Sequence, residues 1–185
     1  MTYSPETPAC QHVQRWLDDM VIGHNFCPFA RFVRDQERIR FVDIASSDMA
    51  RVLEALHDEF LHLDTTSHTS TTLMVLSDGW QQFDDYLMLV DVAQQSLNHW
   101  GYEGEYQLAS FHPDYLFAGE AENAPSHFTN RAPHPVIHII REAEMEQALA
   151  HHPAPESIPQ TNIDTTETLG EEALRAQLKA CKAPR

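Results

Sequence analysis

The sequence predicts an α/β domain of the α+β kind, built on a mixed four-stranded sheet flanked by helices. Helical and strand patterns alternate along the chain in the order α-β-α-β-α-β-β-α. Alternation of strand and helix favours parallel pairing, whereas the last two strands follow each other directly and can pair antiparallel. A length of 185 residues suits one such domain.

The same order of elements occurs in thioredoxin-like folds, and this likeness is one of topology only. A thioredoxin-like fold carries its redox cysteines just after its first core strand, whereas Cys27 precedes the first strand predicted here. The three cysteines, Cys10, Cys27 and Cys181, fit no CxxC or zinc spacing. We therefore expect reduced thiols.

In the first half of the chain, hydrophobic periodicity separates helices from strands. Apolar residues three and four positions apart predict helices, and alternating or continuous apolar runs predict strands. Pro28 prevents a regular helix through the segment after the first helix. Ser46 or Ser47 can cap the second helix, with Asp48 favouring its N-terminal dipole. The predicted elements are a helix over 9–23, a strand over 38–45, a helix over 46–63 and a strand over 71–79.

The second half of the chain continues the same alternation and then adds two strands in succession. Gly101 is a suitable C-cap for the helix that opens this half. A long loop rich in Pro, Gly and Asn separates the two strands, and the last helix of the domain ends before Pro153. The predicted elements are a helix over 81–99, a strand over 102–113, a loop over 114–132, a strand over 134–141 and a helix from 141 onwards.

Composition divides the chain into three parts. Residues 1–152 are expected to form the globular domain. The proline-rich segment over 153–166 has the composition of a linker. Residues 167–185 are expected to form a C-terminal helix, docked on the domain, or a flexible tail.

The charge of the chain excludes several classes of partner. A net charge of -16 repels nucleic acid phosphates and anionic membranes, so no nucleic acid and no membrane partner is expected. The N-terminus has neither the basic nor the apolar region of a signal peptide, and no apolar run approaches the roughly 20 residues of a membrane helix. The sequence therefore predicts a cytoplasmic protein, and no motif implies a cofactor.

The candidate chemistry lies around the last two strands and in the segment after the first helix. Polar residues and prolines crowd both ends of the strand pair, and loops as long as the one between them are often functional. His112 has a pKa suited to general acid–base catalysis, with Asp114 or Glu142 to orient it. Cys27 is a candidate nucleophile, because the nearby Arg31 would lower the pKa of its thiol. The alternative is that the histidine shapes a turn and the cysteine is a small core residue.

Arginines are few in this acidic chain, and three of them form a candidate anion site. Arg31, Arg131 and Arg141 would grip a carboxylate or phosphate and exclude polymers from a small positive pocket. The residues expected to complete this binding site are Asn130, Tyr115 and His138. The alternative is internal salt bridging, of Arg141 with Glu142 or Asp114, and of Arg131 with Glu120 or Glu122.

A metal site is not predicted. His134 and His138 lie four positions apart on a strand, where this separation is about 13 Å, too far for one ion. His138 could still approach His112 from the neighbouring strand or Cys27 from the loop.

Four separated motifs resemble a bacterial family known as domain of unknown function 1415, over roughly residues 12–150. They are VIGHNFCPFARFVR, TTLMVL, GEYQLASFHPDYLFAG and NRAPHPVIHIIREAE. His24, Phe26 and His134 depart from the expected pattern. The resemblance implies no reaction. The residues that match are Cys27, Pro28, Phe29, Arg31, Gln107, Phe111, His112, Pro113, Tyr115, Asn130, Arg131, Pro133, Pro135, His138, Arg141 and Glu142.

Two functional hypotheses follow. In the first, the protein is a small enzyme or a binding protein for a compact anionic metabolite, with an Arg/His/Cys site. In the second, it is a non-catalytic adaptor for a protein partner, and its contact surface is the helix that starts at Glu142 together with the C-terminal segment. The first predicts a pocket that His112, Arg131 and Cys27 face, and the second predicts that these side chains are buried and hydrogen-bonded.

Overall fold

A four-stranded mixed sheet forms the centre of the computed structural model, which describes residues 7–183. The strands are β1 (Ile39–Ala45), β2 (Thr71–Asp78), β3 (Tyr106–Phe111) and β4 (Val136–Arg141). Their order in the sheet is β1-β2-β4-β3. β1 and β2 pair parallel, and β4 is antiparallel to both β2 and β3. The predicted mixed sheet, with its antiparallel last pair, is confirmed.

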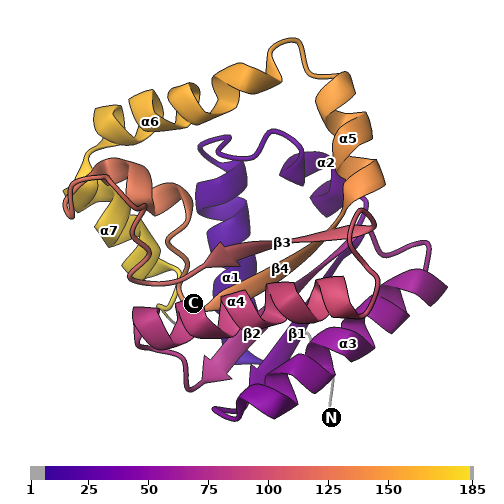
Figure 1. Cartoon of the computed structure of the whole chain (residues 1–185). Coiled ribbons are helices and arrows are strands. Elements are labelled where there is room, and N and C mark those ends of the chain that lie inside the picture. Colours follow the sequence, from indigo (N-terminus) through magenta and orange to yellow (C-terminus); the bar gives the residue numbers. More distant parts are fainter. Residues whose placement is uncertain (1–6, 184–185) are drawn as a thin grey trace.

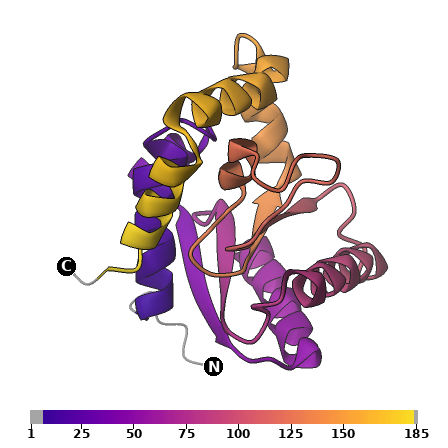
Figure 2. The same ribbon diagram turned by 90° about the vertical axis from the view of Figure 1, so that its left-hand side faces the viewer.

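Helices cover both faces of this sheet (Figures 1 and 2). α3 (Met49–Thr65) and α4 (Phe83–His99) pack on one face. α1 (Pro8–Trp16), its π-helical continuation (Leu17–Ile22) and α7 (Glu171–Ala180) pack on the other. The apolar faces of the strands are thus buried on both sides, which is the main stabilising contribution in a domain of this kind.

Alternation along the strands decides which side chains face which helices. On β2, Met74 and Leu76 belong to the core under α3 and α4, whereas Leu73 and Val75 belong to the core under α1. This is the period of two expected of a strand. His138 pairs across the sheet with Leu73, so its side chain lies on the α1 face.

The start of α3 differs in detail from the prediction. The N-cap is Asp48, whose carboxylate accepts a hydrogen bond from the Ala50 backbone N–H at 3.0 Å. The Ser46 hydroxyl instead accepts from the Asp48 N–H at 3.2 Å and shapes the turn before the helix. The cap therefore falls one residue after the predicted serines, because Asp48 has the extended backbone that an N-cap requires.

The loop between β3 and β4 is ordered by buried polar groups. It contains a 3₁₀ helix (Pro125–Thr129), two residues of which, Ser126 and His127, are buried polar residues. The His127 ring accepts a hydrogen bond from the Phe117 N–H at 3.1 Å and donates one to the Ala121 carbonyl at 2.8 Å. The His127 side chain therefore supplies hydrogen-bond partners for two backbone groups of this loop and holds the loop in one conformation.

The segment predicted to be a linker is largely helical. It contains a 3₁₀ helix (Pro155–Ser157) and most of α6 (Ile158–Leu169), because a proline is well tolerated in the first turn of a helix. Asn162 of α6 donates to the Phe26 carbonyl at 2.9 Å. α7 follows, and Leu174 and Cys181 are buried beside α1, so this part of the chain is docked (Figure 2). The end of the predicted tail, 184–185, lies outside the described residues.

Candidate functional site

A cavity of about 680 Å³ lies on the α1 face of the sheet, where β2 begins and β4 ends. Two helices flank it, α2 (Ala30–Asp35) and α5 (Glu142–Ala150), and Figure 1 shows both at the same end of the molecule. The segment over 27–29 contributes to the wall just before α2 begins. A cavity of this volume is within the range of small-molecule sites, about 300–1,000 Å³.

The walls of the cavity divide by polarity. Phe29, Phe32 and Val33 come from α2 and the residues before it, and Met145 and Ala148 come from α5. Charged side chains come from the strand ends and from the first turn of α5, and Gln147 and His151 add polar groups near the end of α5. Phe32 is 62% exposed, which is unusual for a large aromatic side chain. The cavity therefore has an apolar side around Phe29 and Phe32 and a polar side at the strand ends and the first turn of α5.

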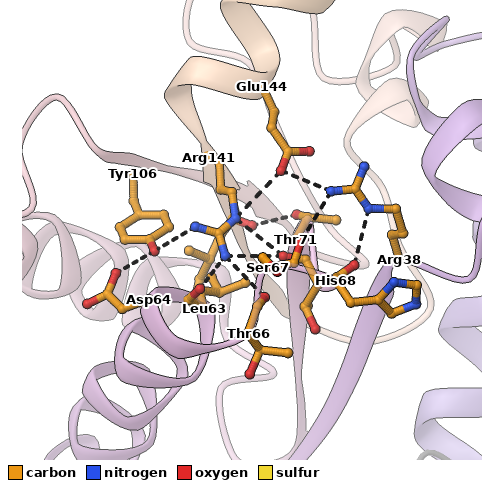
Figure 3. A network of polar contacts seen from close by, with 12 residues as sticks. Arg38, Leu63, Asp64, Thr66, Ser67, His68, Thr71, Tyr106, Arg141 and Glu144 are labelled. Atoms are coloured by element: carbon orange, nitrogen blue, oxygen red, sulfur yellow. Dashed lines mark hydrogen bonds and ion pairs between the residues drawn. The ribbon is translucent and has the colours of Figure 1, made fainter.

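Two arginines and one carboxylate form the polar side (Figure 3). Glu144 on α5 lies 3.3 Å from Arg38 Nη2 and 3.7 Å from Arg141 Nε. The side chains of Arg38 and Arg141 are 24% and 21% exposed. One acid therefore faces two cations, which leaves an excess of one positive charge on this wall.

Arg141 is fixed because its guanidinium closes the end of α3. It donates to the carbonyl oxygens of Leu63, Thr66 and Thr69 and, at 3.1 Å, to the Tyr106 hydroxyl (Figure 3). The last carbonyls of a helix have no partner within the helix, so a cation at this place both satisfies them and interacts favourably with the helix dipole. Arg141 is thus as much a structural residue as a wall of the cavity.

Arg38 precedes β1 and, besides its contact with Glu144, is held by the segment over 67–70. Its Nε donates to the His68 carbonyl at 3.1 Å, and its own carbonyl accepts from the Ser70 N–H at 2.9 Å. Ser70 lines the cavity, and its hydroxyl oxygen is buried without a hydrogen-bond partner among the described residues. A buried hydroxyl of this kind is costly unless a ligand or water satisfies it.

His138 forms the floor together with Thr71. The Thr71 hydroxyl donates to the Ile139 carbonyl and accepts from His138 Nε2 at 2.6 Å, so the proton of the neutral imidazole is on Nε2. Burial lowers the pKa of His138 to about 4. His138 lines the cavity, and within residues 7–183 its Nδ1 has no hydrogen-bond partner. It offers the cavity an acceptor and no charge at neutral pH.

Cys27 lines the same cavity, as a partly buried residue packed against the core under α1. Burial raises the pKa of its thiol, although the backbone N–H groups of Phe29 and Ala30 act in the opposite direction. Arg31, expected to activate it, is exposed on α2 and does not line the cavity. The thiol is therefore protonated at neutral pH.

His112, predicted as a general acid or base, is buried elsewhere and bonded through both ring nitrogens. Nε2 donates to the Trp80 carbonyl at 3.0 Å, and Nδ1 accepts from the Asp114 backbone N–H at 3.0 Å. Burial lowers the pKa of the ring. Asp114 orients it through its backbone, whereas its own side chain is exposed.

Side-chain hydrogen bonds from Asn130 and Arg131 hold the connection between β3 and β4 together. Asn130 donates to the Ser110 carbonyl at 3.1 Å, and Arg131 donates to the Tyr115 carbonyl at 3.1 Å. The Arg131 guanidinium also lies 4.7 Å from the centre of the Phe128 ring. Arg131 therefore contacts the Tyr115 carbonyl and the Phe128 ring, and not Glu120 or Glu122, which were the expected salt-bridge partners.

The structure thus places Arg31 apart from the other predicted residues and separates those into two groups. Cys27, His138 and Arg141 meet at the cavity, whereas His112, Asp114, Asn130, Arg131 and Tyr115 lie in the β3–β4 connection. Sequence reasoning did not single out Arg38, Ser70 and Glu144. The locally positive run over 31–40, in a chain of net charge -16, was the available signal for Arg38.

His134 lies against a different partner from those considered for a metal site. Its Nε2 is 3.0 Å from His12 Nδ1, and the two rings are stacked. Within residues 7–183, no three His, Cys, Asp or Glu side chains are grouped so that they could hold a metal ion. Over the same residues, no helix has the length and apolar character needed to cross a membrane.

Comparison with known proteins gives one family. A family model described as a protein of unknown function, DUF1415, matches residues 8–176, which confirms the resemblance carried by the four motifs. No curated protein and no solved structure matches the chain. The likeness to thioredoxin-like folds therefore stays one of element order.

Proposed function

The chain belongs to the DUF1415 family, and we propose that it is a binding protein for a small organic anion, which it holds in the cavity between α2 and α5. The observation that carries this proposal is the polar wall, where Arg38 and Arg141 face the single carboxylate of Glu144. The excess positive charge is enclosed by a protein whose net charge is -16. A field of that sign repels polyanions most strongly, so this wall suits a compact anion of low charge better than a polymer.

The remaining polar groups of the cavity suit recognition better than catalysis. His138 is neutral, with an acceptor at Nδ1, and the Ser70 hydroxyl lacks a partner among the described residues. Cys27 carries a protonated thiol, which is a weak nucleophile. A few placed polar groups in a largely apolar cavity are typical of small-molecule sites.

A thermal-shift panel tests the proposal. The purified protein is screened against carboxylated, phosphorylated and sulfonated organic anions. A ligand at about 100 times its Kd should raise the free energy of unfolding by roughly 2.7 kcal/mol, which is an easily measured shift in Tm for a chain of this size. The expected result is a subset of anions that stabilises the protein.

Two variants decide whether the cavity is responsible. Arg38→Met removes a cation of the polar wall, and a stabilising anion should lose most of its effect. Arg51→Met is the matched control, because Arg51 is 62% exposed on α3 and pairs only with Glu54 among the described residues. Equal shifts in wild type and Arg38→Met would contradict the assignment to this cavity. Silence of the whole panel would contradict the proposal and favour a protein partner.

A further inference from the structure

We propose that the ligand is an amphipathic monocarboxylate whose head group takes the place of the Glu144 carboxylate between Arg38 and Arg141. Its apolar part then lies against Phe29, Phe32 and Met145. This inference rests on the proposed binding function and adds to it the class of ligand and the residue that the ligand displaces.

The first observation is that Glu144 is loosely held. Its carboxylate lies 3.3 and 3.7 Å from the two guanidinium groups, whereas charge-assisted N–H···O bonds are about 2.7–2.9 Å long. Its side chain is 36% exposed. The Arg40–Glu59 pair of the same protein is a useful contrast, since it measures 2.8 Å and the Glu59 side chain is 1% exposed. Glu144 therefore occupies the anion position without the geometry of a permanent ion pair.

The second observation concerns the helix that carries Glu144. None of the nine described residues of α5 is buried, and no side chain caps its N-terminus. α5 is thus anchored by fewer buried contacts than α3 or α4, each of which buries at least four residues of its apolar side. A helix with so little buried surface can shift outward at small cost.

The donors that face Glu144 favour a carboxylate over a phosphate. Arg141 already donates to three backbone carbonyls and to the Tyr106 hydroxyl, and Arg38 donates through Nε to the His68 carbonyl. Arg38 Nη2 and Arg141 Nε are the atoms that face Glu144. Both face the same oxygen, Oε1 of Glu144, and each also has a backbone acceptor, since Arg38 Nη2 donates to the Ser67 carbonyl and Arg141 Nε to the Thr69 carbonyl. The position therefore accommodates one carboxylate group, whereas a phosphate offers three acceptor oxygens.

The apolar wall supplies the other half of the ligand. Phe32 is 62% exposed beside the cavity, and Phe29 and Met145 line the wall near it. An aromatic or branched aliphatic group would cover these side chains, and removal of their surface from water is favourable. A ligand without an apolar part would leave this wall exposed, so the charge alone would not give useful affinity.

Isothermal titration with a matched set of probes tests this inference. The probes are 3-phenylpropionate, its neutral amide 3-phenylpropanamide, acetate and phenyl phosphate. We expect 3-phenylpropionate to bind, and the amide and acetate to bind about tenfold more weakly or not at all, because each lacks one half of the recognised pattern. Phenyl phosphate should bind more weakly than 3-phenylpropionate.

Substitution of Glu144 tests the displacement itself. Glu144→Gln removes the competing charge but keeps the shape, so the affinity for 3-phenylpropionate should rise about tenfold. Glu54→Gln is the control, because it removes an exposed carboxylate on α3 that pairs with Arg51, and its affinity should equal that of wild type. Glu144→Ala should behave as Glu144→Gln, and circular dichroism confirms that each variant is folded.

The outcomes separate this inference from the function on which it rests. If phenyl phosphate binds more tightly than 3-phenylpropionate, and Arg38→Met abolishes that binding, the anion-binding function stands and the carboxylate class is wrong. If both Glu144 variants bind 3-phenylpropionate no better than wild type, the displacement is wrong. If no probe and no anion of the thermal-shift panel binds, both proposals are wrong.

Discussion

Glu144 and Arg38 meet across the cavity with 3.3 Å between carboxylate and guanidinium, although 106 positions separate them in the sequence. This contact links the first turn of α5 to the residue that precedes β1. Arg38 is thus the second cation of the polar wall beside Arg141, and the Glu144 carboxylate contacts both. The proposed anion site is therefore assembled by tertiary structure, from segments that no local motif connects.

Arg141 should contribute more to stability than to ligand affinity. We expect Arg141→Met to lower the free energy of unfolding by about 2–4 kcal/mol, because it leaves the carbonyls at the end of α3 without their charged donor. Urea denaturation measures this change. Arg51→Met should change stability by less than about 0.5 kcal/mol, since exposed ion pairs contribute little. Equal stability of the two variants would contradict the structural role of Arg141.

His112 should act as a structural residue. We expect His112→Ala to lower the free energy of unfolding by about 3 kcal/mol, because it removes a fully buried ring and the partners of two backbone groups. The affinity of the folded variant for a cavity ligand should be unchanged. A variant of unaltered stability that no longer binds the ligand would show that His112 belongs to the functional site after all.

Stability should fall as the pH falls below about 6.5. The pKa values of His134 and His138 are lowered to about 4 in the folded protein, so between about 4 and 6.5 the unfolded chain binds more protons than the folded one. Each histidine then removes about 1.4 kcal/mol of stability per pH unit over this window. Above the window this contribution is fully present.

His138→Gln isolates one of these two contributions. The glutamine amide can still donate to Thr71 but does not titrate. Urea denaturation at pH 7, 6 and 5 should therefore show a smaller loss of stability on acidification in His138→Gln than in wild type. An identical pH dependence in the two proteins would mean that His138 is not the buried neutral base seen at the cavity floor.

Cys27 should react slowly with thiol reagents at neutral pH. Burial raises the pKa of its thiol, so the reactive thiolate is scarce and the rate of alkylation should still rise as the pH passes the ordinary value for cysteine. Iodoacetamide labelling followed by peptide mass spectrometry measures this rate for Cys27 separately from the buried Cys10 and Cys181. A rate that is already maximal near pH 7 would contradict a protonated thiol and restore Cys27 as a nucleophile.

The sequence predicts the sheet well because its strands have strong local patterns. The alternation at β1 is typical of a strand, and the continuous apolar run at β2 is short and ends at an Asp-Gly turn, which favours a strand over a helix. The segment over 153–166 has the composition of a linker but is largely helical, because its prolines are equally compatible with the first turn of a helix. The Asn162 hydrogen bond, buried Thr166 and Leu169, which packs against the core under α1, anchor α6.

Residue type alone does not separate the residues that line the cavity from those that hold a loop together. Cys27, His138 and Arg141 stand out by residue type, and they do line one cavity. His112 and Arg131 stand out equally, yet their side chains satisfy backbone carbonyls. A polar residue that binds a ligand and one that completes a loop have the same appearance in sequence, because both need donors near strand ends. Their partners decide between them, and these are set by long-range packing.

Protection of Cys27 by a bound ligand tests the central claim most directly, because this thiol lines the proposed site. Its rate of iodoacetamide labelling at pH 9 is measured with and without saturating 3-phenylpropionate, in wild type and in Arg38→Met. If the cavity binds the anion, labelling should slow about tenfold or more in wild type and much less in Arg38→Met at the same ligand concentration. An unchanged rate in wild type, under conditions where calorimetry shows the ligand to be bound, would place the ligand elsewhere and contradict the account.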